Sequence, residues 1–541
     1  MFFNNFYNPH ARFRGIVEKS DENEMIIANE DQKKDLQNIA KGAGFLFAGT
    51  LMVYVLKFFY RLLVSRYLGP SDYGLLSLGE AIANVAIIFT TLGLSFGIIK
   101  LIPHYLSRDD PARVRGMILA ILKISGLMSI FVAIVTILFS QYIAIGIFHK
   151  PLFVPIIIIT AITIPFFTVT NSISNIFLAF QRVNYQNLIN VAGRGFILLL
   201  LTVVAIAYDG KLFWIAVAYL FSHISSLIIG LYFLIRKKIF MISSEIKPKY
   251  EYYQLISFSF PIFLSGIFVQ IMGWVDTLFL SALKEASEVG IYNAALPLVS
   301  TLSIFVSVVG NIFLPTASSL YAKNKTEKVA GLYATVSRWT FLSGLPIMLF
   351  MIFFSKQILT ILFGAEYRTG HIALQILIGA YFLRLSFGPS SQALMMFNET
   401  KKIFYINSFA AVVNVILNYL LIPPYSMMGA AIATTGSIII QEGLIFWIAK
   451  KKLGFVFSLK MYARYLLSGL IGISIIYWMS THMSTNALTI SVLALTYSTM
   501  YFIMLIMLGG FREEDLVIIQ AIEKKFHINL NILTMLIKRF L

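Results

Sequence analysis

Residues 154–180 read VPIIIITAITIPFFTVTNSISNIFLAF, a stretch without a single Lys, Arg, Asp or Glu. A helix of about 20 apolar residues spans the roughly 30 Å hydrocarbon core of a bilayer. This stretch therefore predicts a transmembrane helix. The rest of the chain repeats the pattern, because 58% of its 541 residues are hydrophobic, only 13% are charged, and the mean hydropathy is +0.81.

About fourteen such apolar runs follow one another, separated by short polar loops. Their length and continuity predict an all-α integral membrane protein of about 14 transmembrane helices. The predicted spans are 44–65, 74–99, 116–138, 154–180, 187–207, 212–235, 255–282, 289–314, 331–354, 371–397, 403–422, 427–449, 461–480 and 487–509.

The basic residues are distributed unequally between alternate loops. One set of loops, together with both tails, holds 30 Lys and Arg residues, whereas the opposite set holds 6. Positive charge marks cytoplasmic loops of membrane proteins. We therefore expect a multi-pass protein of the cell (cytoplasmic) membrane with both termini in the cytoplasm.

Composition excludes several classes of function. The chain has no Cys and only 7 scattered His residues, so we expect no metal and no other cofactor. It lacks the glycine-rich phosphate loop of ATPases. The net charge of +18 lies largely in loops beside the spans, where topology and anionic lipid headgroups account for it. We therefore expect no nucleic-acid partner.

Two short matches suggest an internal repeat. Ser71-Asp72-Tyr73-Gly74 is similar to Ser287-Glu288-Val289-Gly290, at an offset of 216, and Ile189-Asn190 is similar to Ile406-Asn407, at an offset of 217. Both offsets correspond to six spans, which preserves orientation in the membrane. The predicted domains are an N-terminal tail (1–43), an N-lobe (44–235), a linker (236–254), a C-lobe (255–449), two further spans (450–509) and an amphipathic cytoplasmic tail (510–541).

Several of these segments resemble one family. Residues 67–74, YLGPSDYG, resemble the signature that follows the first span of polysaccharide-export flippases. Residues 290–295 (GIYNAA), 362–367 (LFGAEY) and 418–434 (NYLLIPPYSMMGAAIAT) resemble later motifs of the same family, although Ser426 stands where a Gly is common. These flippases belong to the multidrug/oligosaccharidyl-lipid/polysaccharide transporter superfamily, and the resemblance covers roughly residues 40–510.

The resemblance implies a flippase rather than an enzyme. Such a protein moves a polyprenyl- or dolichyl-(di)phosphate-linked oligosaccharide across the membrane by alternating access, for cell-surface polysaccharide or glycoprotein assembly. Its expected partners are this lipid-linked substrate, membrane lipids, and glycosyltransferases or a polymerase of the same pathway. Two alternatives remain: a cation-coupled exporter of drugs or other small molecules from the same superfamily, and a membrane-bound sugar polymerase or ligase. The cations of the first span and the two extra spans argue against the exporter, and the short outer loops argue against the enzyme.

Charged side chains inside the spans are the candidate site residues, because they are costly in a membrane and usually serve a function. Lys57 and Arg61 share one helical stripe of the first span with Tyr54, and Arg384 lies near the middle of span 371–397. We interpret Lys57, Arg61 and Arg384 as cavity cations for a diphosphate. The alternatives are that Arg61 extends to the membrane surface and that Arg384 forms a buried ion pair.

The acidic residues Glu80 and Asp276 are candidates for a gate or for ion coupling. A Glu80–Arg61 pair would form an outer gate, and a desolvated Asp276 could take up a cation or proton. Structural salt bridges are the alternative for both. Lys123, Arg194 and Arg338 lie near the cytoplasmic span ends, where we expect them to reach the membrane surface rather than bind substrate.

Uncharged polar residues predict a wall that contacts sugar hydroxyls. Span 154–180 carries a run of such residues, and polar positions on three other spans extend it. The alternative is packing between helices by small polar side chains. The candidates for this wall are Tyr54, Asn84, Thr168, Asn171, Asn175 and Gln270.

Overall fold

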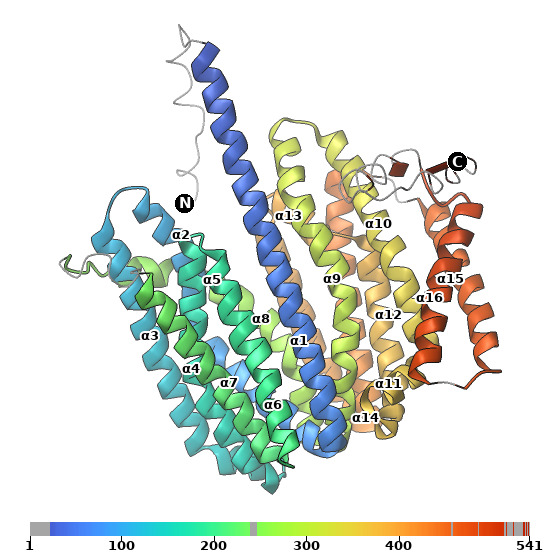
Figure 1. Ribbon diagram of the computed structural model, residues 1–541, viewed down its shortest axis with the longest axis horizontal. Coiled ribbons are helices and arrows are strands. Elements are labelled where there is room, and N and C mark those ends of the chain that lie inside the picture. Colours follow the sequence, from blue (N-terminus) through green and yellow to red (C-terminus); the bar gives the residue numbers. More distant parts are fainter. Residues whose placement is uncertain are drawn as a thin grey trace.

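The structure is a computed structural model that describes residues 22–237, 246–455, 458–484 and 486–512, with a few residues between 515 and 539. The described part is helical and contains no strand, which confirms the all-α prediction. Eleven of its helices are long and apolar enough to cross a membrane. Figure 1 shows them as two groups of helices side by side, with a further pair at one edge.

The first group follows the N-terminal half of the chain. It contains α1 (Glu22–Thr91), α2 (Leu94–Leu106), α3 (Pro111–Leu138), the π-helical η2 (Tyr142–Ile147), the short 3₁₀ turn η3 (Pro151–Phe153), α4 (Val154–Ala179), α5 (Val183–Leu188), the π-helical η4 (Ile189–Ile197), α6 (Leu198–Ala207) and α7 (Leu212–Arg236).

The second group follows the C-terminal half. It contains α8 (Tyr252–Leu283), α9 (Ala286–Ala322), α10 (Thr326–Phe353), α11 (Ser355–Phe363), the 3₁₀ turn η5 (Ala365–Gly370), α12 (His371–Phe387), α13 (Ser390–Met396) and α14 (Thr400–Leu453). The additional pair is α15 (Leu459–Ser480) and α16 (Ala487–Met507), which packs against α10. The predicted domain boundaries are compatible with this grouping but remain predictions.

Two of the long helices are interrupted where the sequence predicts loops. The α1 backbone leaves helical geometry at Gly69 (φ 73°), directly before Pro70, and the α14 backbone does so at Ser426 (φ 51°). Positive φ favours Gly, so Ser426 adopts a strained conformation at the position where the resembling family commonly has Gly. α14 therefore holds two of the predicted spans, whereas α1 holds the first span and most of the second, which is broken at Leu92 and Gly93 and ends in α2. The total of fourteen spans remains a prediction.

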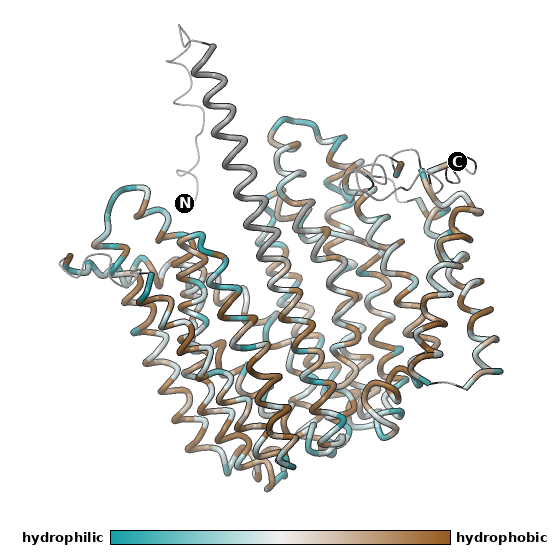
Figure 2. The backbone as a smooth tube through the Cα atoms, in the orientation of Figure 1, coloured by the Kyte–Doolittle hydropathy of each residue, from teal (hydrophilic) through white to brown (hydrophobic). Residues whose placement is uncertain are grey.

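The loops that carry most of the basic residues gather at one end of the bundle, at the top of Figure 1. We call this end the basic end and the other the opposite end. Figure 2 shows apolar helix bodies between polar loops at both ends. The arrangement agrees with the predicted alternation of loops, whereas the assignment of the basic end to the cytoplasm remains a prediction.

At the opposite end the two repeat motifs pack against each other. A Cβ placed on Gly74 would lie 1.8 Å from the carbonyl oxygen of Ala286, and a Cβ on Gly290 would lie 1.9 Å from that of Pro70. Ala286 lies 216 residues after Pro70, and Gly290 lies 216 residues after Gly74. The repeat offset therefore converts one contact into the other. Such a reciprocal contact is typical of elements related by a twofold axis.

Two side chains add further links between the lobes at this end. The Lys150 ammonium, in the loop before α4, donates to the carbonyl oxygens of Ser281 and, at 3.0 Å, of Lys284 at the end of α8. The Tyr367 hydroxyl of the second group donates to the Ser65 carbonyl oxygen of α1 at 2.8 Å. A cation at a helix C-terminus satisfies carbonyl groups that lack helical partners. The opposite end is therefore closed.

At the basic end, the segment before α8 is attached to the start of α3. Asp110 caps α3 by accepting the backbone N–H of Arg113 at 3.0 Å, and this hydrogen bond lowers the pKa of the carboxyl group. The Arg113 guanidinium also donates to Glu251 at 2.9 Å, and Lys249 N–H donates to the Ala112 carbonyl oxygen at 2.9 Å. Residues 249–251 therefore pack against the first lobe directly before α8 begins.

The reciprocal glycine contact generates a prediction about stability. Gly74→Ala should lower the free energy of unfolding by about 1–3 kcal/mol, because the new methyl group overlaps the Ala286 backbone and cannot rotate away. Gly379→Ala is the matched control, since a Cβ at that helical position meets no atom within 4 Å. Thermal unfolding of the purified protein in detergent measures both, and equal melting temperatures for the two variants would contradict the contact.

Candidate functional site

The first lobe holds an ion pair on the polar stripe of α1. The Arg61 guanidinium lies 3.7 Å from the Glu80 carboxylate, and the Tyr60 hydroxyl donates to the same carboxylate at 3.4 Å. The predicted Glu80–Arg61 pair is thus confirmed, although its role as a gate is untested. Tyr73 and Tyr219 lie within electrostatic reach of Arg61, and about a quarter of the Arg61 side chain remains exposed.

Lys57 lies one turn before Arg61 and has a different environment. Its side chain is exposed, whereas that of Arg61 is about three-quarters buried. It lies within electrostatic reach of Arg61, Arg194 and Glu80. Three cations therefore share one acidic neighbour, and this part of the lobe carries an excess of positive charge.

Arg194 is the residue that the sequence argument misplaced. It belongs to the π-helical η4, stacks on the Phe167 ring at 4.3 Å and donates to the Phe167 carbonyl oxygen at 3.2 Å. The wider turn of a π-helix changes the direction of each side chain, and such turns are frequent at functional sites. Arg194 consequently points into the protein beside Lys57, rather than to the membrane surface as expected. No sequence signal marks a π-helix of this kind.

A cavity of about 310 Å³ lies between α1, α2, α4 and α8. Asn84, Asn171 and Gln270, three of the predicted wall residues, line it together with Phe167. Asn84 donates to the Glu80 carbonyl oxygen at 2.7 Å, so the cavity begins one helical turn from the ion pair. The Phe167 ring connects the cavity to Arg194. The amides thus share one cavity between the lobes, and the cations lie outside its lining.

The remaining wall residues have other surroundings. Thr168 is fully buried and its hydroxyl lies 2.8 Å from that of Thr90, so it packs α4 against α1, as the packing alternative expects. Asn175 is half-buried one turn beyond Asn171, and Tyr54 is exposed on α1. Neither residue lines the cavity.

Asp276 of α8 is buried in the second lobe among neutral polar groups. It accepts hydrogen bonds from Tyr292 at 2.6 Å, from Asn418 at 2.8 Å and from Thr434. No ion pair within the described residues includes it, so the salt-bridge alternative does not apply there. The amide oxygens of Asn414 and Asn418, which are also buried in this network, receive no hydrogen bond. The cluster therefore presents several oxygen acceptors and no positive charge.

Arg384 is paired, as the alternative interpretation expects. Its Nε lies 3.3 Å from the Glu442 carboxylate of α14, and about a third of the Arg384 side chain remains exposed. The pair reduces the charge that Arg384 offers to a ligand, because the carboxylate occupies the same guanidinium. Glu442 is itself nearly buried, with about a tenth of its side chain exposed.

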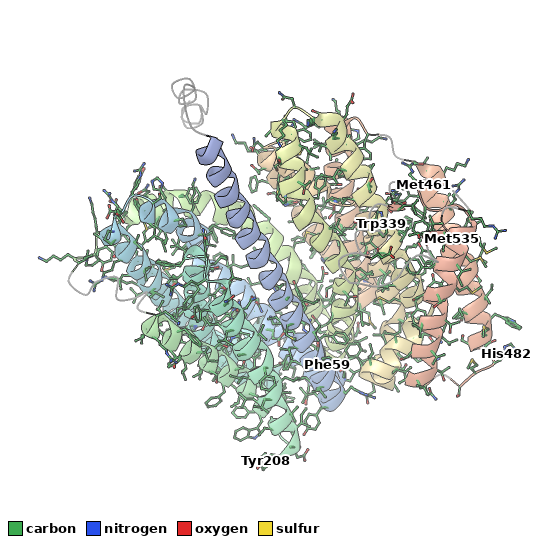
Figure 3. All side chains as sticks on the ribbon, turned by 45° about the horizontal axis from the view of Figure 1, so that its top comes forward. Phe59, Tyr208, Trp339, Met461, His482 and Met535 are labelled. Atoms are coloured by element: carbon green, nitrogen blue, oxygen red, sulfur yellow. The ribbon has the colours of Figure 1, made fainter. Side chains whose placement is uncertain are left out.

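Arg338 also lies inside the protein rather than at the membrane surface. Its guanidinium pairs with Asp515, from the segment after α16, and both side chains are almost fully buried. Trp339 Nε1 and the backbone N–H of Arg512 donate to the same carboxylate, each at 2.8 Å. Figure 3 shows Trp339 and Met461 near this junction. The other residues of the predicted amphipathic tail lie largely outside the described residues.

The described residues include no group of three or more His, Asp or Glu side chains that could hold a metal ion.

Comparison with known proteins identifies the family. The sequence model of the polysaccharide biosynthesis protein family matches residues 39–321, more than half of the chain. The protein therefore belongs to this family of multi-pass membrane proteins. A second model, that of MatE, matches residues 261–420.

Individual proteins resemble the chain over most of its length. An uncharacterized membrane protein of Methanocaldococcus jannaschii, MJ1068, is 25% identical over 80% of this chain and 88% of its own. A protein named "Putative O-antigen transporter" from Shigella flexneri is 24% identical over 71% of this chain and 91% of its own. The solved structure of the lipid II flippase MurJ, in an inward closed conformation, shares the fold with a TM-score of 0.66 at 19% identity, covering 85% of this chain and 97% of MurJ.

The Arg338–Asp515 pair generates a second prediction. Asp515→Asn should destabilise the protein by about 3–5 kcal/mol, because it leaves the Arg338 charge buried without a counter-charge. The double variant Arg338→Met, Asp515→Leu should recover most of this loss, since it removes both charges. A double-mutant cycle of thermal unfolding in detergent measures the coupling. Independent, additive effects of the two positions would contradict a direct pair.

Proposed function

We propose that this protein is a flippase that moves a lipid-linked oligosaccharide across the cell membrane by alternating access, with both termini in the cytoplasm. The diphosphate and its sugars would pass between the lobes while the polyprenyl or dolichyl chain remains in the lipid. The cationic cluster of Lys57, Arg61 and Arg194 is the observation that carries the proposal. Guanidinium and ammonium groups bind diphosphate oxygens through charge-assisted hydrogen bonds.

The closed opposite end supports a direction of loading. The reciprocal contact of Gly74 and Gly290 blocks passage there, so substrate would enter from the basic end. Release then requires the lobes to separate at the glycine contact and to approach each other at the basic end. The Arg61–Glu80 pair lies on this route and is our candidate for the gate: a diphosphate would compete with Glu80 for Arg61 and weaken the pair.

The amide-lined cavity supports a sugar subsite. Asn84, Asn171 and Gln270 offer both donors and acceptors, which suit hydroxyl groups of varied stereochemistry. The aromatic residues Phe167 and Trp274 in the same lining offer flat apolar surfaces for sugar rings. This subsite begins one turn from Glu80, so a diphosphate at the cations would place its first sugars there.

Asp276 is our candidate for ion coupling. The carboxylate and the two amide oxygens without donors could take up a proton or a hard cation such as Na⁺, which prefers oxygen ligands. Uptake would relieve the cost of a buried negative charge and would change the packing of α8 against α14. One charge moving through a potential of 100 mV is worth about 2.3 kcal/mol.

The alternatives differ in the cavity that they require. A cation-coupled drug exporter needs an anionic or apolar cavity, whereas the first lobe holds Lys57, Arg61 and Arg194 near the single acid Glu80. The proposed transport breaks and forms no bond in the substrate, which distinguishes it from the activity of a sugar polymerase or ligase. Glycosyltransferases or a polymerase of the same pathway are the proposed partners, because they would supply and consume the lipid-linked sugar on the two sides of the membrane.

A transport assay tests the cationic cluster. Vesicles that contain the protein and a fluorescent polyprenyl-diphosphate-linked saccharide report flipping through loss of the label to a membrane-impermeant quencher. Lys57→Gln and Arg194→Gln should each slow flipping roughly 10- to 100-fold, because each removes a charge-assisted hydrogen bond of about 1.5–3 kcal/mol. Arg384→Gln should have a smaller effect, since Glu442 shares that charge.

Lys323→Gln is the control for that assay, because this exposed lysine lies in a loop far along the chain from the cluster. Native rates in both Lys57→Gln and Arg194→Gln would disprove the cluster as the substrate site. Efflux of cationic dyes by the native protein, without flipping of the saccharide, would instead favour the exporter.

Ion coupling gives a separate prediction. Asp276→Asn should make flipping insensitive to imposed proton or Na⁺ gradients and reduce the driven rate to the rate without a gradient, because the neutral amide cannot change its charge. Asp109→Asn, at an exposed turn of the basic end, should retain the native response. A native gradient response in Asp276→Asn would exclude Asp276 as the coupling residue while leaving the flippase proposal intact.

A further inference from the structure

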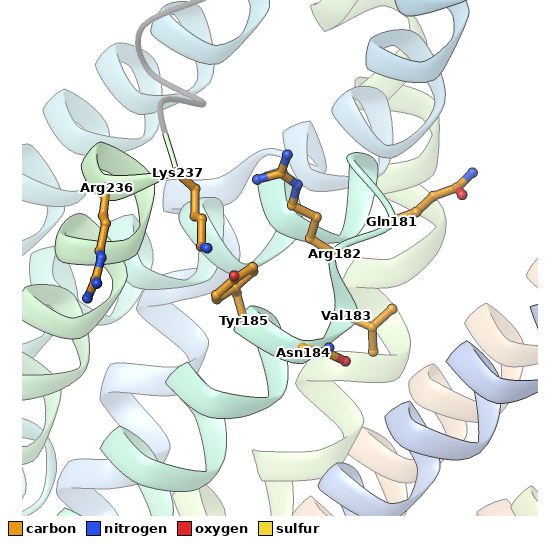
Figure 4. A pocket seen from close by; sticks show the side chains of 7 residues that line it. All are labelled: Gln181, Arg182, Val183, Asn184, Tyr185, Arg236 and Lys237. Carbon is orange, nitrogen blue, oxygen red and sulfur yellow. The ribbon is translucent and has the colours of Figure 1, made fainter. Parts of the chain in front are cut away.

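A second pocket lies on the first lobe at the basic end, apart from the cavity between the lobes. The turn between α4 and α5 and the last residues of α7 enclose a volume of about 590 Å³ (Figure 4). Small-molecule sites typically measure roughly 300–1,000 Å³. The pocket shares no lining residue with the cavity between α1, α2, α4 and α8. Its lining consists of Gln181, Arg182, Val183, Asn184, Tyr185, Arg236 and Lys237.

Tyr185 gives the pocket a rigid base. Its ring centre lies 5.3 Å from that of Phe177 and 5.1 Å from that of Phe233, so one aromatic neighbour comes from α4 and another from α7. The turn beside it is also fixed: Gln181 adopts a left-handed conformation (φ 57°), and Arg182 N–H donates to the Phe177 carbonyl oxygen at 2.8 Å. These contacts hold the backbone of Arg182 in place before any ligand binds.

The pocket concentrates positive charge without acidic residues in its lining. Arg182, Arg236 and Lys237 are exposed, and no ion pair within the described residues includes them. Arg236 is partly engaged, because it donates to the Tyr232 hydroxyl. Figure 4 shows Arg182 and Lys237 on either side of one opening with Tyr185 at its base, and Arg236 turned away from it. The Lys237 ammonium lies 5.3 Å from the centre of the Tyr185 ring.

We propose that this pocket binds the phosphate group of an anionic membrane lipid. The planar guanidinium of Arg182 suits two phosphate oxygens, and the Lys237 ammonium adds a second charge from the other side. Both residues stand at helix ends, since Arg182 precedes α5 and Lys237 follows α7, and basic pockets beside the ends of membrane-spanning helices favour anionic lipids. The inference goes beyond the proposed function, since it concerns a resident lipid and not the transported one.

General charge at the basic end is the competing explanation, because basic loops set membrane topology whether or not they bind anything. It does not require two cations to face one opening over a fixed aromatic ring. The two explanations differ in whether the position of the charge matters or only its amount. A variant that removes the same charge from another loop of this end therefore separates them.

The test measures thermal unfolding of the full chain in detergent while a short-chain phosphatidylglycerol, dioctanoyl phosphatidylglycerol, is added. A ligand of the native state raises the melting temperature in proportion to the logarithm of its concentration relative to Kd. We expect the variant Arg182→Gln, Lys237→Gln to need a lipid concentration at least roughly tenfold higher for the same rise. The control Lys323→Gln, Lys325→Gln, which removes two exposed charges of the α9–α10 loop, should respond as the native protein does.

The outcomes are distinct. Equal loss of response in the two double variants would overturn the pocket in favour of general charge. Inorganic phosphate, tested alone, should give no rise at concentrations where the lipid does; an equal rise would overturn the lipid in favour of a free anion. The melting temperature without ligand shows whether each variant is folded. Arg182→Lys, which keeps the charge but not the planar group, should retain part of the response.

Discussion

The close approach of Gly74 and Gly290 is the contact on which the arrangement of the two lobes depends. Gly74 lies against the backbone of Ala286, and Gly290 lies against the backbone of Pro70. No side chain larger than hydrogen fits there, so the geometry is determined by the absence of a Cβ rather than by a specific attraction. Lys150 and Tyr367 stabilise the same closed end with hydrogen bonds to backbone carbonyl groups.

The two lobes share an arrangement but differ in charge. Shifting Lys57 and Arg61 by the repeat offset gives Gly273 and Thr277, so the stripe that is cationic in α1 is neutral in α8. Thr277 donates to Asn293, and Asp276 beside it is held by neutral donors. The other buried charges of the second lobe are neutralised in the Arg384–Glu442 and Arg338–Asp515 pairs. One lobe thus has unbalanced positive charge, and the other has unbalanced negative charge.

Features that depend on local periodicity could be predicted from the sequence. The length of the apolar runs gave the helical bundle, and spacings of three and four placed Lys57 and Arg61 on one stripe. The Glu80–Arg61 pair followed because two opposite charges at similar depth in adjacent spans attract each other strongly. Asn84, Asn171 and Gln270 could be placed in one cavity because each lies on a polar stripe of its helix.

Features that depend on irregular backbone or on distant segments could not be predicted. Arg194 was misplaced because its direction depends on the π-helical η4. Thr168 was predicted to belong to the polar wall because of its residue type. Its hydrogen bond with Thr90, which the sequence does not reveal, assigns it to helix packing instead. Arg338 lay near a predicted span end, a position from which an arginine side chain usually reaches the membrane surface. No periodic pattern in the sequence connects it to a partner as distant as Asp515.

That distance has a consequence for how the protein is made. Arg338 and Asp515 are separated by 177 positions in the chain. At a synthesis rate of roughly 5–20 residues per second, Arg338 enters the membrane about 9–35 seconds before its counter-charge exists. The second lobe must therefore tolerate an uncompensated arginine while α15 and α16 are still being inserted. Its final packing is therefore coupled to a segment that is synthesised only after all of its own helices.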